Sequence, residues 1–297
     1  MAELTVGDLV DRTYRKLHSV YSEEMDVINE GGQFTTADTT MTLLYASSTI
    51  GEGDIVEVEQ ELMYAISLTT NDLEIIRGYM DTTAVAHADG SHVRINPRFS
   101  RLDILNALRD TINSWSDLYW VDHATTNIDA HDNTNRGFVV SGLEDDFKEI
   151  KKIRYLNNDG VVASLNTSAA WVERDFLDSD YTYLNMERGF YSPTQSGGVN
   201  VDILYSRPFR TELFEEATLL ETQIKLPPSM HDIPMMGALW RLLSTEEGAS
   251  ADPAPQGLYR NREERPPGYV QQVALTYRGL HDARASEEGL KLEERYG

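Results

Sequence analysis

The clearest hydrophobic pattern in the chain is an apolar stripe that begins just after residue 100. Its members recur every three or four residues, the spacing at which side chains share one face of an α-helix: Leu102, Leu105, Leu108, Ile112 and Trp115. Ser100 and Asp103 stand at the start of the stripe as a Ser-x-x-Asp pattern, in which each side chain can bond the backbone N–H of the other. The pattern therefore predicts a capped helix from 101 to about 120.

Three further segments show helical spacing, at 6–20, 235–245 and 269–285. The first opens on Thr5-x-x-Asp8, which is a second capping pattern. The apolar positions of the three segments are Val6, Leu9, Val10, Thr13 and Leu17; Met236, Leu239, Trp240 and Leu243; and Val270, Val273, Ala274, Tyr277 and Leu280. Gly279 and Gly289 weaken the last segment, so its end is expected to fray.

Between these segments the pattern changes to short β-branched or alternating runs, which are typical of strands. In 31–95 the predicted strands lie at 40–45, 55–58, 62–68 and 73–77, and in 137–226 they lie at 138–140, 150–155, 170–172, 181–185 and 199–205. Turn-forming Gly, Asn and Asp residues separate the runs. Such spacing predicts a β-meander or a compact barrel.

The predicted fold class is α+β, a helical bundle built from sequence-distant helices with inserted antiparallel β regions. Its parts are a first bundle helix (1–30), a β insert (31–96), a core helix (97–122), a second β region (123–226), a core helix (227–247), a hinge loop (248–267) and a C-terminal helical docking arm (268–297). The predicted helical core comprises Leu105, Leu108, Ile112, Trp115, Leu239, Trp240 and Leu243.

The charge balance narrows the classes of function. The chain has 26 Lys plus Arg against 49 Asp plus Glu, a formal charge of −23. This disfavours a dedicated nucleic-acid binder, which needs cationic contacts to phosphate, but it suits the wall of a passage along which DNA slides. No apolar run approaches the roughly 20 residues that span a bilayer. The first residues lack the basic and apolar regions of a signal peptide, so we expect folding in a cytoplasm.

Sequence patterns that carry catalysis or bind cofactors are missing. The chain has no cysteine, which excludes disulfides, thiolate metal sites and a cysteine nucleophile. It also lacks the Gly-x-Ser-x-Gly nucleophile elbow and both common phosphate-binding glycine patterns. We therefore expect a protein that is not an enzyme, with no catalytic residue and no cofactor.

Two polar clusters were weighed as metal sites. His87 and His92 flank Asp89, but their spacing matches no strong zinc pattern, and the favoured interpretation is that His87 buttresses its loop by hydrogen bonding. The polar loop at 122–136 lacks the order of a calcium loop, so it is interpreted as solvated, with a structural cation as the open alternative. The acidic groups at 144–146 and 215–216 are interpreted as solvated or channel-facing.

Residues 73–99 carry the most specific pattern in the chain. A short strand enters a glycine-punctuated loop, and a second strand with Val93 and Ile95 leads to the capped helix. The marker positions are Arg77, Gly78, Thr82, Thr83, Ala84, His87, Ala88, Gly90, Val93 and Pro97. This order of strand, loop and helix resembles head-to-tail connector (adaptor or neck) proteins of tailed bacteriophages. Segments 199–208 and 226–243 resemble the same family, so that about half of the chain is covered.

The resemblance implies a non-enzymatic virion structural protein, one subunit of a head-to-tail adaptor ring. The ring, expected to be a dodecamer, would dock under the phage portal protein, meet a tail or stopper protein, and continue the channel for double-stranded DNA without sequence-specific binding. It would lie in the neck of the virion after assembly in the host cytoplasm, with no membrane contact. The expected portal or subunit interface is Arg260, Arg262, Arg265, Tyr269 and Tyr277.

Two other functions stay open at this point. One is another structural station in the virion, such as a tail-terminator, tail-completion or baseplate subunit, which would be distinguished by the symmetry of its ring. The other is a carbohydrate-binding module of a phage fibre, which the β content and the aromatic residues favour. The four predicted helices and the absence of a trimeric repeat speak against this second alternative.

Overall fold

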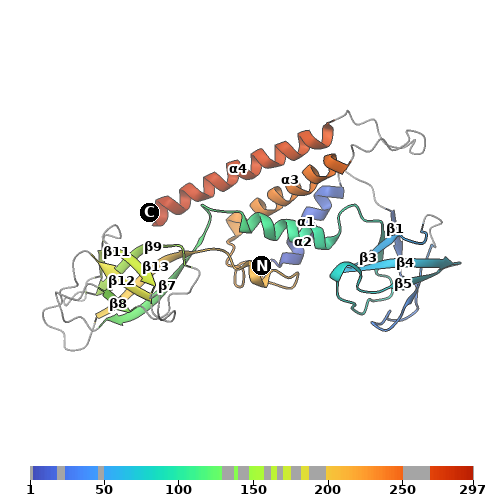
Figure 1. Cartoon of the computed structure of the whole chain (residues 1–297), viewed down its shortest axis with the longest axis horizontal. Helices are drawn as coiled ribbons and strands as arrows, with labels where there is room; N and C mark the ends of the chain where they lie inside the picture. The colour runs from blue at the N-terminus through green and yellow to red at the C-terminus, as the bar shows by residue number, and fades with distance from the viewer. Residues whose placement is uncertain are drawn as a thin grey trace. The chain divides into compact units, whose positions relative to one another are not determined.

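The computed structural model describes residues 3–18, 24–45, 50–128, 137–139, 147–156, 162–165, 170–174, 182–186, 199–249 and 268–296 (Figure 1). The chain divides into two compact units. Unit 1 comprises Met1–Ile112, Glu212–Gln223 and Pro227–His281, and unit 2 comprises Asn113–Thr211, Ile224–Leu226 and Asp282–Gly297. No helix among the described residues is both long enough and apolar enough to cross a membrane.

Unit 1 contains a curled, six-stranded antiparallel sheet with the order β1-β6-β3-β4-β5-β2. Its strands are β1 (Glu24–Val27), β2 (Thr40–Thr42), β3 (Ile55–Val58), β4 (Glu61–Thr69), β5 (Asp72–Ile76) and β6 (His92–Ile95). Residues Glu59 and Thr70 have positive φ angles of 54° and 57° in the two tight turns that flank β4. The sheet curls around a hydrophobic cluster of its own, which includes Phe34, Met41 and Met63.

Four α-helices are described, and three of them lie wholly or almost wholly in unit 1: α1 (Val6–His18), α2 (Arg101–Asn113) and α3 (Asp232–Ala249). The fourth, α4 (Tyr269–Tyr296), is shared between the units. Helices α1 and α3 pack together. The apolar stripe predicted for the first helix is confirmed, because its five members are all buried: Val6, Leu9, Val10, Thr13 and Leu17.

Both predicted helix caps are confirmed. Before α1, the backbone N–H of Thr5 donates to Asp8 Oδ2 (2.9 Å) and the N–H of Asp8 donates to Thr5 Oγ1 (3.1 Å). Before α2, Ser100 and Asp103 make the same reciprocal pair, with both distances at 3.0 Å. Each pair satisfies backbone donors that a helix cannot satisfy internally, so the capping patterns correctly mark where the helices begin.

Unit 2 contains a four-stranded antiparallel sheet of order β10-β9-β13-β7 and a three-stranded sheet of order β11-β12-β8. The strands are β7 (Trp120–Ile128), β8 (Gly137–Val139), β9 (Glu149–Leu156), β10 (Val162–Leu165), β11 (Ala170–Arg174), β12 (Thr182–Met186) and β13 (Val199–Arg207). One face of the larger sheet is buried through Ala124, Ile153, Ile203 and Tyr205. These residues alternate along their strands, as expected for a sheet with one covered face.

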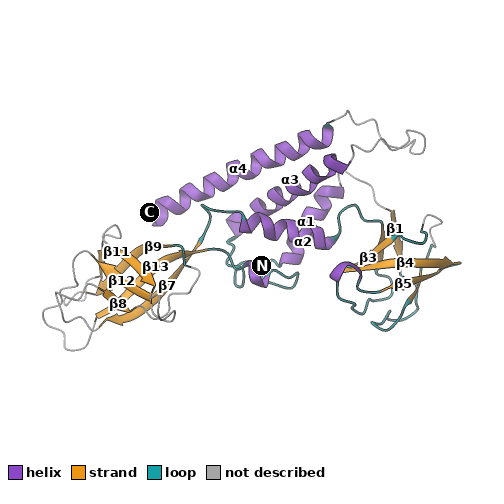
Figure 2. Cartoon of the chain, viewed as in Figure 1, coloured by secondary structure: helices purple, strands orange, loops and turns teal. Residues whose placement is uncertain are grey.

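The predicted helical bundle with inserted β regions is wrong. Among the described residues thirteen elements are strands and four are α-helices, and the fold is mostly β (Figure 2). The physical reason is that the strands of unit 1 bury their apolar residues against one another in a complete core. Such a sheet needs no helical bundle to cover it, so the β segments are structural units rather than insertions.

The predicted helical core divides between the units and varies in burial. Leu108, Ile112, Trp115, Leu239 and Leu243 are buried, whereas Leu105 and Trp240 are half-buried. The helix predicted to reach about 120 instead ends at Asn113. Trp115 lies after that end and packs edge-on against Phe209 within unit 2, with the ring centroids 5.5 Å apart. Trp115 is therefore buried by contacts outside α2, and its match to the helical spacing of that stripe is accidental.

Two glycines in the helices of unit 1 have opposite surroundings, and they provide a matched test of the packing. A Cβ on Gly237 of α3 would lie 2.2 Å from Thr111 Cγ2, whereas a Cβ on Gly279 of α4 would meet nothing within 4 Å. The Thr111 hydroxyl donates to Ala107 O (2.7 Å), which holds that side chain in place.

We expect Gly237→Ala to lower the free energy of unfolding by about 1–3 kcal/mol through overpacking. The matched change Gly279→Ala should raise it by roughly 1 kcal/mol, because alanine favours an exposed helix position over glycine. Urea unfolding of both variants measures the difference. Equal effects of the two changes would mean that α3 does not pack closely against Thr111.

Candidate functional site

A buried carboxylate organises the loop on which the resemblance depends. Glu61 begins β4, and its side chain is fully buried. Its two oxygens accept hydrogen bonds from Arg77 Nε (2.6 Å) and Nη2 (2.7 Å), and from the backbone N–H groups of Gly78 and Val85 (both 3.1 Å). Nε2 of His87 lies 2.9 Å from the same carboxylate. One side chain thus holds four residues of the 77–87 loop against the sheet.

His87 is completely buried and is held from several sides. Besides its contact with Glu61, its Nδ1 lies 3.2 Å from the exposed carboxylate of Glu59. Its backbone N–H and C=O pair with those of Phe34 (2.8 and 2.9 Å), and the two rings are stacked. Arg77 in turn lies over the Phe34 ring, with its guanidinium carbon 4.4 Å from the ring centroid. The interpretation of His87 as a buttress of its loop is confirmed.

The charge state of Glu61 is fixed by this network. Burial raises the pKa of its carboxyl, but the hydrogen bonds from Arg77, Val85, His87 and Gly78 outweigh it and hold the pKa below its ordinary value. Glu61 is therefore ionised in the folded protein at neutral pH. Its lone pairs are occupied by structural partners, so the arrangement serves to fix the loop.

The backbone of the loop adopts left-handed conformations at three residues. Gly78, Met80 and Asp81 all have positive φ angles, of 62°, 53° and 62°. A Cβ on Gly78 would come within 2.9 Å of the carbonyl oxygen of Thr82, which explains the need for glycine. The Thr82 hydroxyl accepts from the backbone N–H of Leu62 (3.1 Å) and fastens the far side of the loop to β4.

The proposed metal interpretation of this segment finds no geometric counterpart. His92 lies exposed in β6, while His87 is buried against Glu61. Over the ranges that the structure describes, no three His, Asp or Glu side chains are grouped so that they could hold a metal ion. Of the polar loop predicted at 122–136, residues up to Ile128 belong to β7, and 129–136 lie outside the described residues, as do the acidic residues 144–146.

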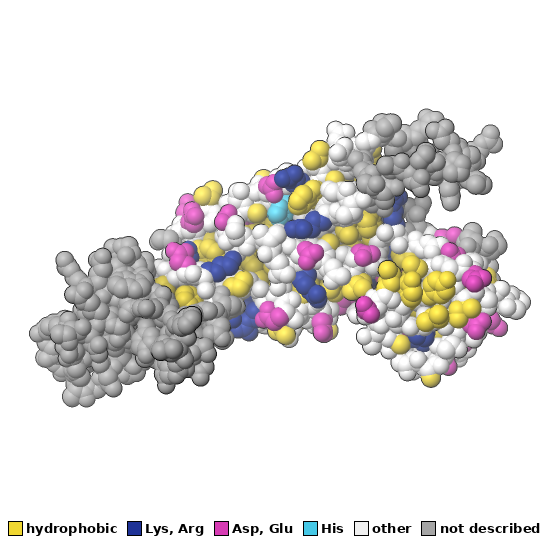
Figure 3. Space-filling view, in the orientation of Figure 1, with side chains coloured by type: hydrophobic (Ala, Val, Ile, Leu, Met, Phe, Trp, Pro, Cys, Tyr) yellow, Lys and Arg dark blue, Asp and Glu magenta, His cyan; other side chains and the backbone are white. Residues whose placement is uncertain are grey.

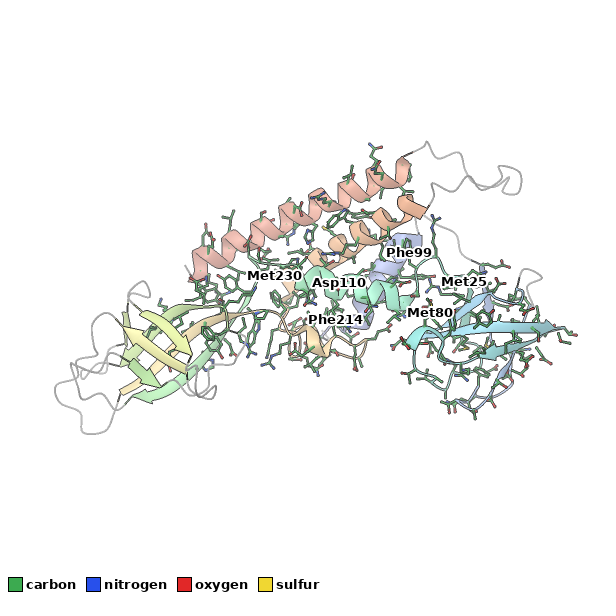
Figure 4. All side chains as sticks on the ribbon, viewed as in Figure 1. Met25, Met80, Phe99, Asp110, Phe214 and Met230 are labelled. Carbon is green, nitrogen blue, oxygen red and sulfur yellow. The ribbon has the colours of Figure 1, made fainter. Side chains whose placement is uncertain are left out.

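A second ionic cluster joins the sheet of unit 1 to α2. Arg94 of β6 pairs with Glu57 of β3 and donates to the backbone oxygen of Phe99 (2.9 Å), the residue labelled in Figure 4 just before α2. The other oxygen of Glu57 accepts the backbone N–H of Arg101 (2.6 Å), the first residue of α2. The guanidinium of Arg94 also lies 4.1 Å from the Tyr14 ring centroid on α1. These bonds set the direction in which α2 leaves the sheet.

Arg101, the first residue of α2, forms further ion pairs that hold this helix. It pairs with Asp11 of α1 (2.7 Å) and with Glu216 (2.9 Å). Burial lowers the pKa of Arg101, but the hydrogen bonds and charges of Glu216 and then of Asp11 outweigh it and raise the pKa. A pocket of about 210 Å³ lies beside these residues. Because two carboxylates already neutralise Arg101, the pocket has no cation to offer an anionic ligand.

Unit 2 contains an unexpected gathering of cations around an indole ring. Trp120 Nε1 donates to Pro208 O (2.9 Å), which fixes the ring in a half-buried position. Three cations lie close to its centroid: Arg207 at 5.2 Å, Arg210 at 5.5 Å and Lys225 at 5.5 Å. Each distance falls in the range of cation–π attraction. Together with Lys151 these residues are called the cationic cluster below.

Lys151 lies over the ring of Tyr119, the residue before Trp120, with its ammonium nitrogen 4.6 Å from the ring centroid. It also pairs with Glu149 at 2.7 Å. Burial lowers the pKa of Lys151, but the hydrogen bonds with Glu149 and Tyr119 outweigh it and raise the pKa, so the ammonium is charged at neutral pH.

The cationic cluster is only partly neutralised. Arg207 is buried and pairs with Asp122 at 3.3 Å. Arg210 and Lys225 are half-exposed, and within the described part of the chain neither forms an ion pair with a carboxylate. Lys225 has a left-handed backbone with φ 68°, an uncommon conformation for a residue with a side chain. Two positive charges are thus left to face solvent in a chain of net charge −23.

The residues expected at the portal or subunit interface are only partly described. Arg260, Arg262 and Arg265 lie outside the described residues. Tyr269, the first residue of α4, is exposed, and Tyr277 is half-buried. Burial, and then the neighbouring Tyr269, raises the pKa of Tyr277, so the Tyr277 phenol is neutral at neutral pH.

Sequence reasoning missed Glu61 and the cationic cluster. Glu61 is the last of three alternating glutamates, after Glu57 and Glu59, and nothing in that pattern distinguishes the buried Glu57 and Glu61 from the exposed Glu59. The run of Lys148, Lys151, Lys152 and Arg154 was the available signal in unit 2. No protein-family model matches the chain, and a search of curated proteins finds no relative. A functional assignment must therefore come from the residues themselves.

Proposed function

We propose that the chain is a non-enzymatic structural subunit of a tailed-phage virion, which assembles into the adaptor ring between the portal protein and the tail. The observation that carries the proposal is the structural role of the residues in the 73–99 pattern. Arg77, Gly78, Thr82 and His87 interlock around Glu61 to build one loop, which leads into the capped helix α2. The pattern therefore describes a fold element, as expected where the resemblance is one of architecture.

The electrostatics of the described groups agree with this function. The most buried carboxylates and guanidinium groups of unit 1 bind one another: Glu61 with Arg77 and Glu57 with Arg94, and Arg101 likewise pairs with two acids. The formal charge of −23 would make a ring built from this chain repel the phosphate backbone of DNA. In such a ring the neck would conduct double-stranded DNA without binding it.

The proposal includes a station and partners. The ring would be a dodecamer beneath the portal, in the neck of the virion, and would meet a tail or stopper protein on its other side. The segment containing Arg260, Arg262 and Arg265 and the start of α4 at Tyr269 would contact the portal. Residues 260–265 carry three Arg against two Glu, a slight positive excess in an acidic chain, which suits an acidic docking surface because opposite charges steer the encounter and fix the register.

Electron microscopy of the full-length chain mixed with the portal protein of the same virion tests the proposal. A ring of added density beneath the portal is the expected result. The variant Arg260→Glu/Arg262→Glu/Arg265→Glu should lose that density, while the matched variant with three Arg→Lys changes should keep it. A wild-type chain that adds no ring to the portal would refute the adaptor function.

A further inference from the structure

The end of β5 and the loop after it expose two large apolar and two acidic side chains close together in sequence, called the acidic tip here: Glu74, Ile76, Met80 and Asp81. Ile76 is 51% exposed and Met80, labelled in Figure 4, is 59% exposed, which are high values for large apolar side chains. Glu74 and Ile76 are both exposed and lie two residues apart, so they share one face of β5.

The acidic tip is held in a fixed shape. Tyr64 lies opposite Ile76 in the sheet, and its ring packs against that of Tyr79 with the centroids 5.4 Å apart. Met80 and Asp81 are held in left-handed backbone conformations, which cost energy unless the surroundings enforce them. Here the bonds of Glu61 to Gly78 and Val85 fix the loop on either side of them. A strained backbone that exposes the apolar side chain of Met80 indicates that this side chain contacts a partner.

The surroundings of the tip are strongly negative. Residues 24–98 contain thirteen Asp and Glu but only three Arg, of which Arg77 and Arg94 are buried in ion pairs. On the face drawn in Figure 3, acidic side chains outnumber basic ones over the six-stranded sheet. The acidic tip therefore suits a partner that offers positive charge beside an apolar or aromatic surface.

The cationic cluster of unit 2 offers that combination. Arg210 and Lys225 are half-exposed beside the Trp120 ring and carry charges that no described carboxylate neutralises. We propose that the acidic tip of one copy of this chain docks on the cationic cluster of the next copy. Glu74 and Asp81 would face Lys225 and Arg210, while Met80 would cover the indole. This contact deepens the proposed ring function and rests on it.

The geometry of such a contact agrees with a ring. The tip and the cluster are different surfaces, so each copy donates one and receives with the other. A contact of this kind is heterologous, and it forms a closed ring when the rotation between successive copies closes and an open filament when it does not. Nucleic acid is the less suitable occupant of the cluster. Two unneutralised cations give few phosphate contacts, and the remaining charge of the chain opposes a polyanion.

A charge-swap experiment on the full-length chain tests the contact. Variant A carries Arg210→Glu and Lys225→Glu, and variant B carries Glu74→Arg and Asp81→Arg. Self-association of the chain, measured by sedimentation velocity over a concentration series at low salt, should weaken by about tenfold or more in each variant, because like charges then meet. An equimolar mixture of A and B should regain the wild-type behaviour, since every tip again meets a cluster of opposite charge.

The control variant is Arg12→Glu/Arg15→Glu, which makes the same change in net charge on exposed arginines of α1. It should associate as the wild type does. The contact is refuted if the wild type stays monomeric both alone and with the portal protein, if variant A associates normally, or if the mixture of A and B fails to recover. Binding of a DNA duplex that variant A loses while it still self-associates would also refute it, in favour of nucleic acid.

The outcome separates this contact from the proposed function. If variant A still completes a ring beneath the portal, the contact is wrong and the adaptor function stands. If the wild type associates through the tip and the cluster but adds no ring to the portal, the contact stands and the adaptor function is wrong.

Discussion

Replacing Glu61 by Gln is expected to lower the free energy of unfolding by about 3–5 kcal/mol, the cost of leaving a buried partner charge uncompensated. The substitution keeps the size of the side chain but removes the charge that faces Arg77, whose side chain is only 8% exposed. Because the amide keeps only one oxygen, it also removes the acceptor for the N–H group of either Gly78 or Val85, which bond different oxygens of Glu61. Urea unfolding followed by circular dichroism measures the loss.

The matched control is Glu59→Gln, two residues earlier. Glu59 also contacts His87, but its carboxylate is mostly exposed, so the loss should be about 1 kcal/mol or less. Similar losses in the two variants would show that Glu61 does not hold the loop.

The same carboxylate predicts a dependence on pH. Because folding lowers the pKa of Glu61, its contribution is complete above the ordinary value of 4.5 and disappears as the pH falls through the lowered pKa. The wild type should therefore lose stability on acidification, and the margin by which it exceeds Glu61→Gln should shrink. A margin that stays constant from neutral to acidic pH would contradict the assigned role of the charge.

Leu108→Ala is expected to cost about 2–5 kcal/mol, the usual range for removing a fully buried leucine and leaving a cavity. Leu108 lies on the buried side of α2 and has no exposed surface. The matched control is Leu105→Ala on the same helix, because Leu105 is half-buried beside the pocket and should lose less than half as much. Denaturant unfolding compares the two, and a larger loss at Leu105 would mean that α2 faces its neighbours differently.

Local patterns in the sequence predicted the features that local physics decides. Both capping pairs and the buried stripe of α1 followed directly from spacing. Strand β3 has the predicted bounds, and β4 and β5 lie within one residue of them. In each of these segments a continuous or alternating apolar pattern coincides with a buried face, so that the pattern and the packing agree.

Features decided by distant pairing were not predictable. Strand β7 is polar, and of its side chains with described burial only Ala124 is buried; it forms because β13 pairs along its whole length. The segment Glu24–Val27 was placed with the first helix but forms β1 against β6. Neither segment carries an apolar signal of its own.

The candidate sites likewise combine features that the local sequence reveals with features that depend on residues far apart in the chain. The importance of the 73–99 loop was visible in its glycines and in His87, but its organiser Glu61 lies in a different strand. The cationic cluster draws on β9, β13 and a turn before α3, which meet only through the sheet of unit 2. A single sequence contains no signal that joins positions so far apart.

The measurement that tests the central claim most directly is the symmetry of the ring that the chain forms on its portal protein. Class averages from electron microscopy should show twelve subunits in a closed ring coaxial with the portal, around an open channel. A sixfold ring would place the chain at a tail station instead. A portal that remains bare in the presence of the full-length chain would contradict the adaptor function altogether.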